Sequence, residues 1–259
     1  MINKLAKIGE LKIFFDYKWE EIDIGCSDTK VYKLTKGQEV LFLKAGKSSS
    51  LTDEYNNLKK LKKYLNVPEV IFHYDNDIEI LITTAMNGEM SCQERFIHDF
   101  PEKTVDILCD AIRTIQSVSA DDDLRKEFKV FDVKEEVQDI KKKILAGKIK
   151  EIPNKSVFDR FSSLGEVISY LENNQPKGEL CLSHGDASMP NVFVDKGGFV
   201  GFIDVGNAGI RQKWYDIADL YISIRRNFQS QEIADKFLTK LNIQNKSPVE
   251  YYEMLTYLS

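Results

Sequence analysis

The sequence predicts an α+β protein with two lobes, a small antiparallel β-sheet carrying one helix and then a larger, mainly helical part. Three observations lead to this prediction. Short alternating or β-branched runs fill the first third of the chain, apolar residues recur at helical spacing after residue 88, and one β-hairpin interrupts the helices near residue 195. We place the boundary after residue 86, so that residues 1–86 form the first lobe and residues 87–259 the second.

Five short strands make up the predicted sheet, expected at Glu21–Gly25, Lys30–Thr35, Glu39–Lys44, Val70–Tyr74 and Glu79–Thr84. The second and third strands join through Lys36-Gly37-Gln38, and the last two through Asp75-Asn76-Asp77, which has favourable turn chemistry. A helix is expected over about residues 52–65, and we expect the serines at 48–50 or Thr52 to cap its start.

The second part reads as helices around a hairpin. Apolar spacing predicts helices over about 103–118, 133–144, 161–171, 214–224 and 230–241, with a last helix from Pro248. The hairpin pairs Val192–Asp195 with Phe199–Ile203 through a Lys196-Gly197-Gly198 turn.

Composition excludes several classes of function. With a net charge of −5 the chain has no global basic field for nucleic acid, and its lysine clusters read as solvated helix faces. Apolar runs are too short for a membrane span, and the first residues do not resemble a signal peptide. The four cysteines stand far apart without a CxxC pair, which indicates reduced thiols and a cytoplasmic protein.

The segment from Ser183 to Gly206 carries the most chemical information. Asp186 and Asn191 bracket a loop that enters the hairpin, and Asp204 ends the return strand, so hairpin pairing is expected to bring Asn191 and Asp204 together. A carboxylate and an amide oxygen are hard ligands that suit Mg²⁺. Asp186 is then placed to accept a proton from a substrate hydroxyl, which is the division of labour that phosphoryl transfer requires.

The first lobe offers a matching set of residues. Lys44 lies at the end of a strand and Glu54 early on the following helix, and a lysine held by a helix glutamate is how kinases fix nucleotide phosphates. Ser27 lies in a short turn whose N–H groups and hydroxyl are suited to phosphate. Taken singly, each feature is more often structural: a turn, a strand end or a surface charge. Their combination favours catalysis.

Together these residues resemble the aminoglycoside phosphotransferases, and specifically the branch that phosphorylates the 3′ position of kanamycin-type antibiotics. The resemblance covers nearly the whole chain. Its strongest part is Leu182–Arg225, which includes Gly201-Phe202-Ile203-Asp204 and Lys213-Trp214-Tyr215-Asp216-Ile217-Ala218. Lys30–Leu34 and Pro101-Glu102-Lys103 also look like the same family.

The resemblance implies a two-lobed, protein-kinase-like fold that uses ATP or GTP with Mg²⁺. It implies that residues 1–86 bind the nucleotide and that residues 87–259 hold the catalytic and acceptor-binding groups. The implied roles are catalysis for Asp186, metal binding for Asn191 and Asp204, phosphate binding for Lys44 with Glu54 and for Ser27, base stacking for Phe42, hinge contacts for Thr84 to Met86, and bracing of the catalytic loop for Asp216.

The chain departs from the resemblance where the acceptor is expected to bind. Asn207 stands where the family commonly has an arginine. The acidic segments that hold polycationic antibiotics correspond to acid-poor stretches here, near which only Glu151, Glu253 and the Ser259 carboxylate remain. We therefore expect a narrower range of acceptors than an acidic pocket would give.

We interpret the chain as an O-phosphotransferase whose leading acceptor is an aminoglycoside, acting as a monomer or weak dimer. One alternative keeps the chemistry and changes the acceptor to another antibiotic or a metabolite hydroxyl, as in choline or homoserine kinases. An alternative of another class is a nucleotide-binding pseudoenzyme, against which the complete set of Lys44, Asp186, Asn191 and Asp204 argues.

Overall fold

The computed structural model describes residue 5, residues 8–22 and residues 29–259, which form two compact units. Unit 1 comprises Met1–Gly88 and Gly201–Asn207, and unit 2 comprises Glu89–Val200 and Ala208–Ser259. The division differs from a single cut after residue 86, because the chain returns to unit 1 at 201–207. A Cβ on Gly201 would lie 2.3 Å from the backbone oxygen of Asn66, so only glycine allows this close approach.

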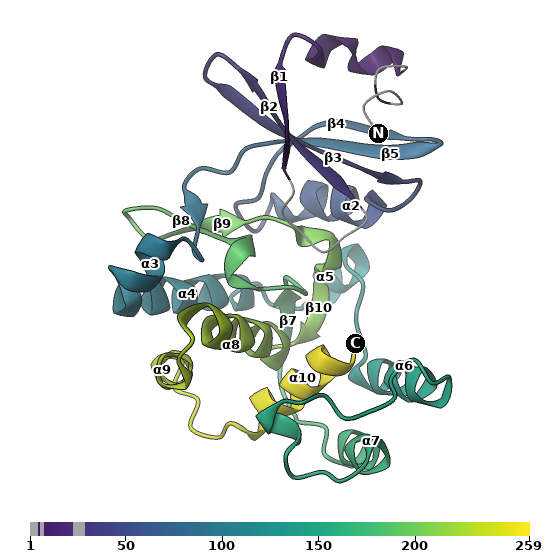
Figure 1. Cartoon of the computed structure of the whole chain (residues 1–259), viewed down its shortest axis with the longest axis vertical. Helices are drawn as coiled ribbons and strands as arrows, with labels where there is room; N and C mark the ends of the chain where they lie inside the picture. Colours follow the sequence, from purple (N-terminus) through teal and green to yellow (C-terminus); the bar gives the residue numbers. More distant parts are fainter. Residues whose placement is uncertain (1–4, 6–7, 23–28) are drawn as a thin grey trace. The chain divides into compact units, whose positions relative to one another are not determined.

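Unit 1 contains the predicted five-stranded antiparallel sheet, in the order β1-β2-β3-β5-β4 (Figure 1). Its strands are β1 (Lys18–Ile22), β2 (Lys30–Lys36), β3 (Glu39–Lys47), β4 (Val70–Asp75) and β5 (Ile78–Thr84). Two further elements of unit 1 are the 3₁₀ helix η1 (Gly9–Phe14) and the helix α2 (Thr52–Leu61). The sheet prediction is confirmed, with strand ends that differ by a few residues.

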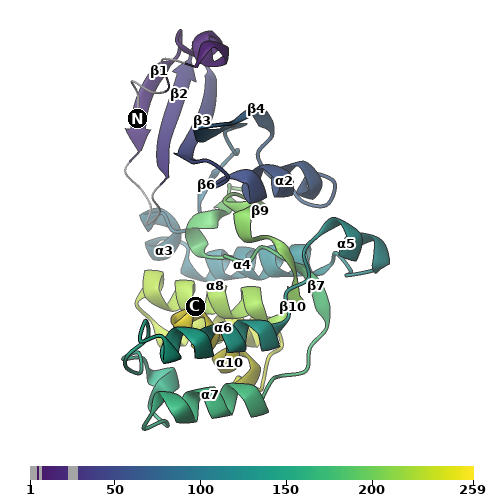
Figure 2. The ribbon, with the colours of Figure 1, turned by 90° about the vertical axis from the view of Figure 1, so that its right-hand side faces the viewer.

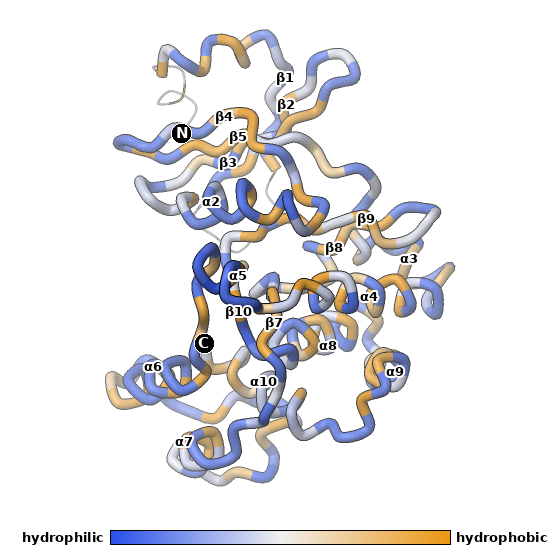
Figure 3. Tube along the Cα trace, turned by 180° about the vertical axis from the view of Figure 1, so that it is seen from behind, coloured by the Kyte–Doolittle hydropathy of each residue, from blue (hydrophilic) through white to orange (hydrophobic). Residues whose placement is uncertain are grey.

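The two faces of the sheet have different partners. Side chains alternate along a strand, so Leu41, Leu43 and Ala45 of β3 share one face, which packs with η1 in an apolar core. The side chains of Phe42 and Lys44 therefore lie on the opposite face. Five consecutive residues of β5 are buried, and Figure 3 shows this strand as predominantly hydrophobic, as expected for a strand covered on both faces.

The start of α2 is held by a distant carboxylate. Neither Thr52 nor the serines before it cap the helix through a side chain, so that prediction is wrong. Instead the fully buried Glu79 of β5 accepts hydrogen bonds from the Leu51 N–H and, over 2.8 Å, from Thr52 Oγ1. The negative charge of Glu79 also complements the positive end of the helix dipole.

Unit 2 is mainly helical, and α4, α6, α7 and α8 run in similar directions in Figure 2. Its helices are α3 (Glu94–His98), α4 (Pro101–Gln116), α5 (Asp122–Glu127), α6 (Val133–Leu145), α7 (Leu164–Asn173), α8 (Trp214–Phe228), α9 (Gln231–Lys240) and α10 (Ser247–Leu258). The apolar face of α4 packs on α9, and α8 packs on both α9 and α10. Among the described residues, every helix is too short or too polar to cross a bilayer.

Two small sheets carry the loops of the site. In one, β7 (Leu180–Ser183) pairs antiparallel with β10 (Gly209–Gln212). In the other, β6 (Glu89–Met90) and β9 (Phe199–Phe202) flank β8 (Val192–Val194). The predicted hairpin is therefore present as β8 and β9, whereas β6, β7 and β10 were not anticipated from the sequence.

Candidate active site

Lys44, Glu54 and Asp204 form one ionic cluster in unit 1. The Lys44 ammonium donates to both oxygens of Glu54, over 2.6 and 2.8 Å, and also contacts the Asp204 carboxylate. Burial alone would lower the pKa of Lys44, but the charges and hydrogen bonds of the two carboxylates raise it. The lysine is therefore a stable cation, and Glu54, in the first turn of α2, fixes its direction.

The backbone at Asp204 has an unusual conformation. Its φ angle is +58°, in the left-handed region that non-glycine residues rarely adopt. The turn that follows, Val205–Asn207, is a single 3₁₀ turn in the same unit. Such a conformation persists only where the surroundings enforce it, and it is found disproportionately at functional sites.

Three of the other predicted nucleotide-binding residues, Phe42, Thr84 and Met86, lie in the described part of unit 1. Phe42 is partly buried two residues before Lys44, on the same face of β3. Thr84, at the end of β5, exchanges hydrogen bonds with the backbone of Glu69, and Met86 Sδ accepts from an Asn66 amide over 3.7 Å. Ser27 lies outside the described residues.

The predicted catalytic loop lies in unit 2, directly after β7. Asp216, 2% exposed in the first turn of α8, accepts three hydrogen bonds from the loop. The donors are Ser183 Oγ at 2.9 Å, the His184 N–H at 2.9 Å and the Gly185 N–H at 3.1 Å. Asp216 thus braces the loop, and Asp186 lies exposed beyond it.

Asp186 is held by its neighbours on the same loop. Asn191 Nδ2 donates to the backbone oxygen and to the carboxylate of Asp186, each over 3.0 Å. The buried His184 accepts from the Asp186 N–H through Nδ1 over 3.2 Å, which agrees with a packing role for this histidine. Since the Asn191 amide nitrogen is used in this way, its oxygen is the atom left for a metal.

The two predicted metal ligands belong to different units, Asn191 to unit 2 and Asp204 to unit 1. No cluster of three or more His, Cys, Asp or Glu side chains suited to a metal occurs in the part of the chain that the structure describes. The residues nevertheless fit Mg²⁺ chemically. The Asp204 side chain is 46% exposed and already faces a cation, the Lys44 ammonium. Asp204 and Asn191 each offer a hard oxygen ligand.

The three predicted acceptor residues have different surroundings. Glu151 is exposed in an irregular segment, and Ser259 is exposed at the end of α10. Glu253 is only 2% exposed and pairs with Arg225, which also donates to Tyr257. Its charge is therefore already compensated by Arg225. The expectation that Glu253 contacts a cationic acceptor stays a prediction.

An acid that sequence reasoning missed lies on α8. The partly buried Asp219 accepts a hydrogen bond from Thr256 Oγ1 of α10 over 2.9 Å. Burial and the charges of Asp216 and Asp186 raise the pKa of Asp219 to about 7, although the Thr256 hydrogen bond opposes this. Nothing in the local sequence distinguishes Asp219 from an ordinary helix acid, because its environment arises from residues far away in the chain.

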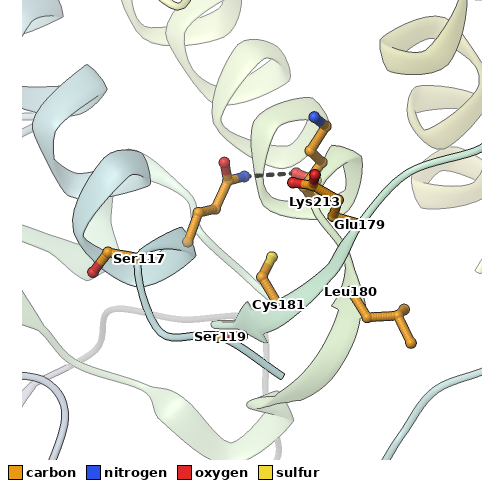
Figure 4. A pocket seen from close by; sticks show the side chains of 7 residues that line it. Ser117, Ser119, Glu179, Leu180, Cys181 and Lys213 are labelled. Carbon is orange, nitrogen blue, oxygen red and sulfur yellow. Dashed lines mark hydrogen bonds between the residues drawn. The ribbon is translucent and has the colours of Figure 1, made fainter. Parts of the chain in front are cut away.

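A surface pocket of about 470 Å³ in unit 2 contains none of the predicted site residues. It lies beside β7, with Ser117 and Ser119 on one side and Glu179 and Lys213 on the other (Figure 4). Burial raises the pKa of the Cys181 thiol in this pocket to about 12, so the thiol is not a reactive nucleophile.

Comparison with known proteins gives consistent matches over most of the chain. Residues 18–248 match the model of a family described as the phosphotransferase enzyme family. An aminoglycoside 3′-phosphotransferase of Enterococcus faecalis is 27% identical, with 94% of each chain covered. One of Campylobacter jejuni is 29% identical, covering 89% of this chain and 92% of the relative.

Solved structures match the fold. An aminoglycoside 3′-phosphotransferase of type VIII has a TM-score of 0.74 at 20% identity, covering 100% of this chain and 99% of the other. An aminoglycoside phosphotransferase of Streptomyces rimosus, solved with ADP and streptomycin, has a TM-score of 0.72 at 18% identity, with coverage of 100% and 99%. These matches confirm the predicted α+β, kinase-like fold and the resemblance seen in the sequence.

Proposed function

Because this chain belongs to the phosphotransferase enzyme family, we propose that it transfers the γ-phosphoryl group of ATP or GTP to a hydroxyl of an aminoglycoside antibiotic. The observation that carries the proposal is the ion pair of Lys44 with Glu54 beside Asp204, all within unit 1. Kinases use this combination to hold nucleotide phosphates. The names of the relatives supply the acceptor class.

The residues of unit 1 are assigned to the nucleotide. Lys44, directed by Glu54, neutralises phosphate oxygens, and Phe42 on the same face of β3 offers a ring for the base. Thr84 and Met86 are proposed to meet the edge of the base, and Ser27 to cover a phosphate. Asp204 and Asn191 are proposed to hold Mg²⁺, which supplies positive charge to the phosphate oxygens when bound.

Asp186 is assigned to the acceptor hydroxyl. Its carboxylate is exposed and held by Asn191, so it is ready to orient the hydroxyl and take its proton as the phosphoryl group transfers. Asp216 does not touch the substrate in this scheme but fixes the loop on which Asp186 lies. Glu151 and the Ser259 carboxylate are proposed to attract amino groups of the acceptor.

The surroundings of Glu253 favour a second candidate acceptor. Arg225 already neutralises Glu253, and the Lys155 ammonium lies 5.3 Å from the centre of the Tyr257 ring. Positive charge in this part of unit 2 disfavours the most highly charged aminoglycosides. An antibiotic or metabolite hydroxyl with fewer amino groups is therefore the alternative substrate of the same reaction.

The test is a transfer assay with purified protein, Mg²⁺, and ATP or GTP. Kanamycin- and neomycin-type compounds are compared with less charged antibiotics and small alcohols, while ADP or GDP formation is coupled to an optical signal. Mass spectrometry of the acceptor must show one added phosphoryl group, and Asp186→Asn protein is the control. If no aminoglycoside in the panel were phosphorylated when the nucleotide is present, the proposed acceptor would be wrong.

A further inference from the structure

We propose that Asn57 is a positioning residue that holds the backbone after Asp204 and thereby presents the Asp204 carboxylate to the metal. Asn57 lies on α2 and is 8% exposed. Its amide nitrogen Nδ2 donates to the backbone oxygens of Val205, over 2.9 Å, and Gly206, over 3.0 Å. All of these residues belong to unit 1.

The two carbonyl groups are consecutive and follow Asp204 directly. One Asn amide nitrogen carries two N–H donors, so a single side chain can satisfy both carbonyls. Fixing two successive peptide groups restricts the backbone torsions of the turn, and the preceding residue is the one with φ of +58°. Asn57 therefore supplies the local constraint that this sparsely populated conformation requires.

The same helix turn holds the other half of the ionic cluster. Glu54 and Asn57 are three residues apart, so they project from neighbouring positions on α2. Glu54 holds Lys44, while its Cβ lies 3.6 Å from the position that a Cβ on Gly206 would take. The turn at Gly206 therefore lies at ordinary packing distance from α2 at Glu54, and α2 sets the positions of Lys44 and Asp204 together.

The inference rests on the proposed metal role of Asp204, and it makes a specific claim about affinity. If Asn57 acts through Asp204, its loss should reduce the gain in nucleotide affinity that Mg²⁺ provides. Nucleotide affinity without metal, which depends on Lys44, should change little. A purely structural residue would lower both affinities together or neither, and would act mainly on the melting temperature.

The experiment measures ADP binding by calorimetry, with and without Mg²⁺, for the wild-type protein, Asn57→Leu and Asn57→Ala. Leucine has a similar size but donates no hydrogen bond, whereas alanine leaves room for water at the carbonyls. Asn56→Ala, at an exposed position on the same helix, is the matched control. We expect the Mg²⁺-dependent gain to fall about 10-fold in Asn57→Leu, less in Asn57→Ala, and not at all in the control.

Each outcome decides the matter. A wild-type affinity independent of Mg²⁺ would contradict the metal role of Asp204, and the inference with it. An Mg²⁺-dependent gain that persists in folded Asn57→Leu, or an equal loss with and without metal, would overturn the inference alone. If Asn57→Leu does not fold, Asn57→Ala gives the same comparison, and its far-ultraviolet circular dichroism establishes that it is folded.

Discussion

In unit 1 the carboxylates of Glu54 and Asp204 share one ammonium group, that of Lys44, whereas in unit 2 Asp186, Asp216 and Asp219 influence one another as like charges. In the first cluster both carboxylates face the Lys44 ammonium, and their charges and hydrogen bonds raise the pKa of Lys44. In the second, Asp216 receives three hydrogen bonds from the loop, and Asp219, with the single hydrogen bond from Thr256, is the group whose pKa is raised. The opposite charges of the cluster in unit 1 suit the binding of an anionic nucleotide. The like charges of the aspartates in unit 2 favour proton uptake by Asp219, near Asp186, the proposed proton acceptor.

Removing the Asp204 carboxylate from the cluster in unit 1 should have the largest effect. Asp204→Ala is expected to lower the rate of transfer by roughly 10³–10⁵-fold, since a metal is worth several kcal/mol of charge stabilisation. Mg²⁺ should no longer strengthen ADP binding. Steady-state kinetics and calorimetry measure both effects, and a variant that keeps Mg²⁺-dependent binding would separate Asp204 from the metal.

Removing the proposed proton acceptor of unit 2, Asp186, should affect kcat rather than nucleotide binding. Asp186→Asn is expected to lower kcat by about 10²–10⁴-fold, the range for a positioned base, while ADP affinity stays close to that of the wild type. The Asn191 amide loses only one hydrogen-bond partner, so the loop should remain folded. Near-normal kcat would remove Asp186 from its proposed role.

Weakening the cluster in unit 1 at Glu54, while leaving the proposed metal ligand Asp204 in place, should have an intermediate effect on ADP affinity. In Glu54→Gln the Lys44 ammonium keeps Asp204 and one amide oxygen of the glutamine, but it loses the second hydrogen bond and the negative charge of the partner. ADP affinity is expected to fall about 10-fold, since hydrogen bonds to charged groups contribute roughly 1.5–3 kcal/mol and glutamine keeps part of the contact. Asp53→Asn, an exposed neighbour on α2, is the control, and an equal loss in both variants would indicate a general effect of charge on the helix.

The smallest expected effect is on stability and concerns the like-charge cluster. The pKa of Asp219 is raised from 3.8 to about 7 in the folded protein, so its ionisation costs folding free energy as the pH rises from about 4 to 7. Asp219→Asn should therefore be more stable than the wild type at pH 8, by about 1–3 kcal/mol, and equally stable near pH 4. Melting temperatures across this range test the sign.

A matched substitution one turn earlier should give the opposite result. Asp216→Asn replaces an acceptor of three hydrogen bonds, so it should destabilise the protein at pH 8 rather than stabilise it. If both substitutions moved the melting temperature in the same direction, the distinction between the two aspartates would be wrong.

The sequence predicts the parts of this molecule that depend on local patterns. Alternation of side chains reveals the five strands, and the turn residues reveal the β8–β9 hairpin. The four-residue strands β7 and β10 are too short to show a period, and they pair across a separation that no local signal encodes. The predicted cap of α2 is wrong for the same reason, because the start of the helix is held by Glu79, a buried residue of strand β5.

The candidate site shows the same limit. Lys44, Glu54, Asp186, Asn191 and Asp204 are recognisable because their chemistry and spacing form a known combination. Asn57 and Asp219 are not recognisable, since an asparagine or aspartate on a helix is usually a solvated residue. Their environments arise only when the 205–206 turn meets α2 and when α10 meets α8.

Because residues 201–207 belong to unit 1, they also limit where the chain could be split into two polypeptides. The chain passes between the units three times, at 88–89, 200–201 and 207–208. A fragment ending at Gly88 would retain Lys44 and Glu54 but would lack Asp204 and the Asn57-bound turn. If residues 1–88 and 89–259 were co-expressed as separate polypeptides, unit 1 would be divided between the two fragments, whereas residues 89–259 would contain all of unit 2. An insertion at the exposed Lys196-Gly197 positions of the β8–β9 turn would leave both units whole.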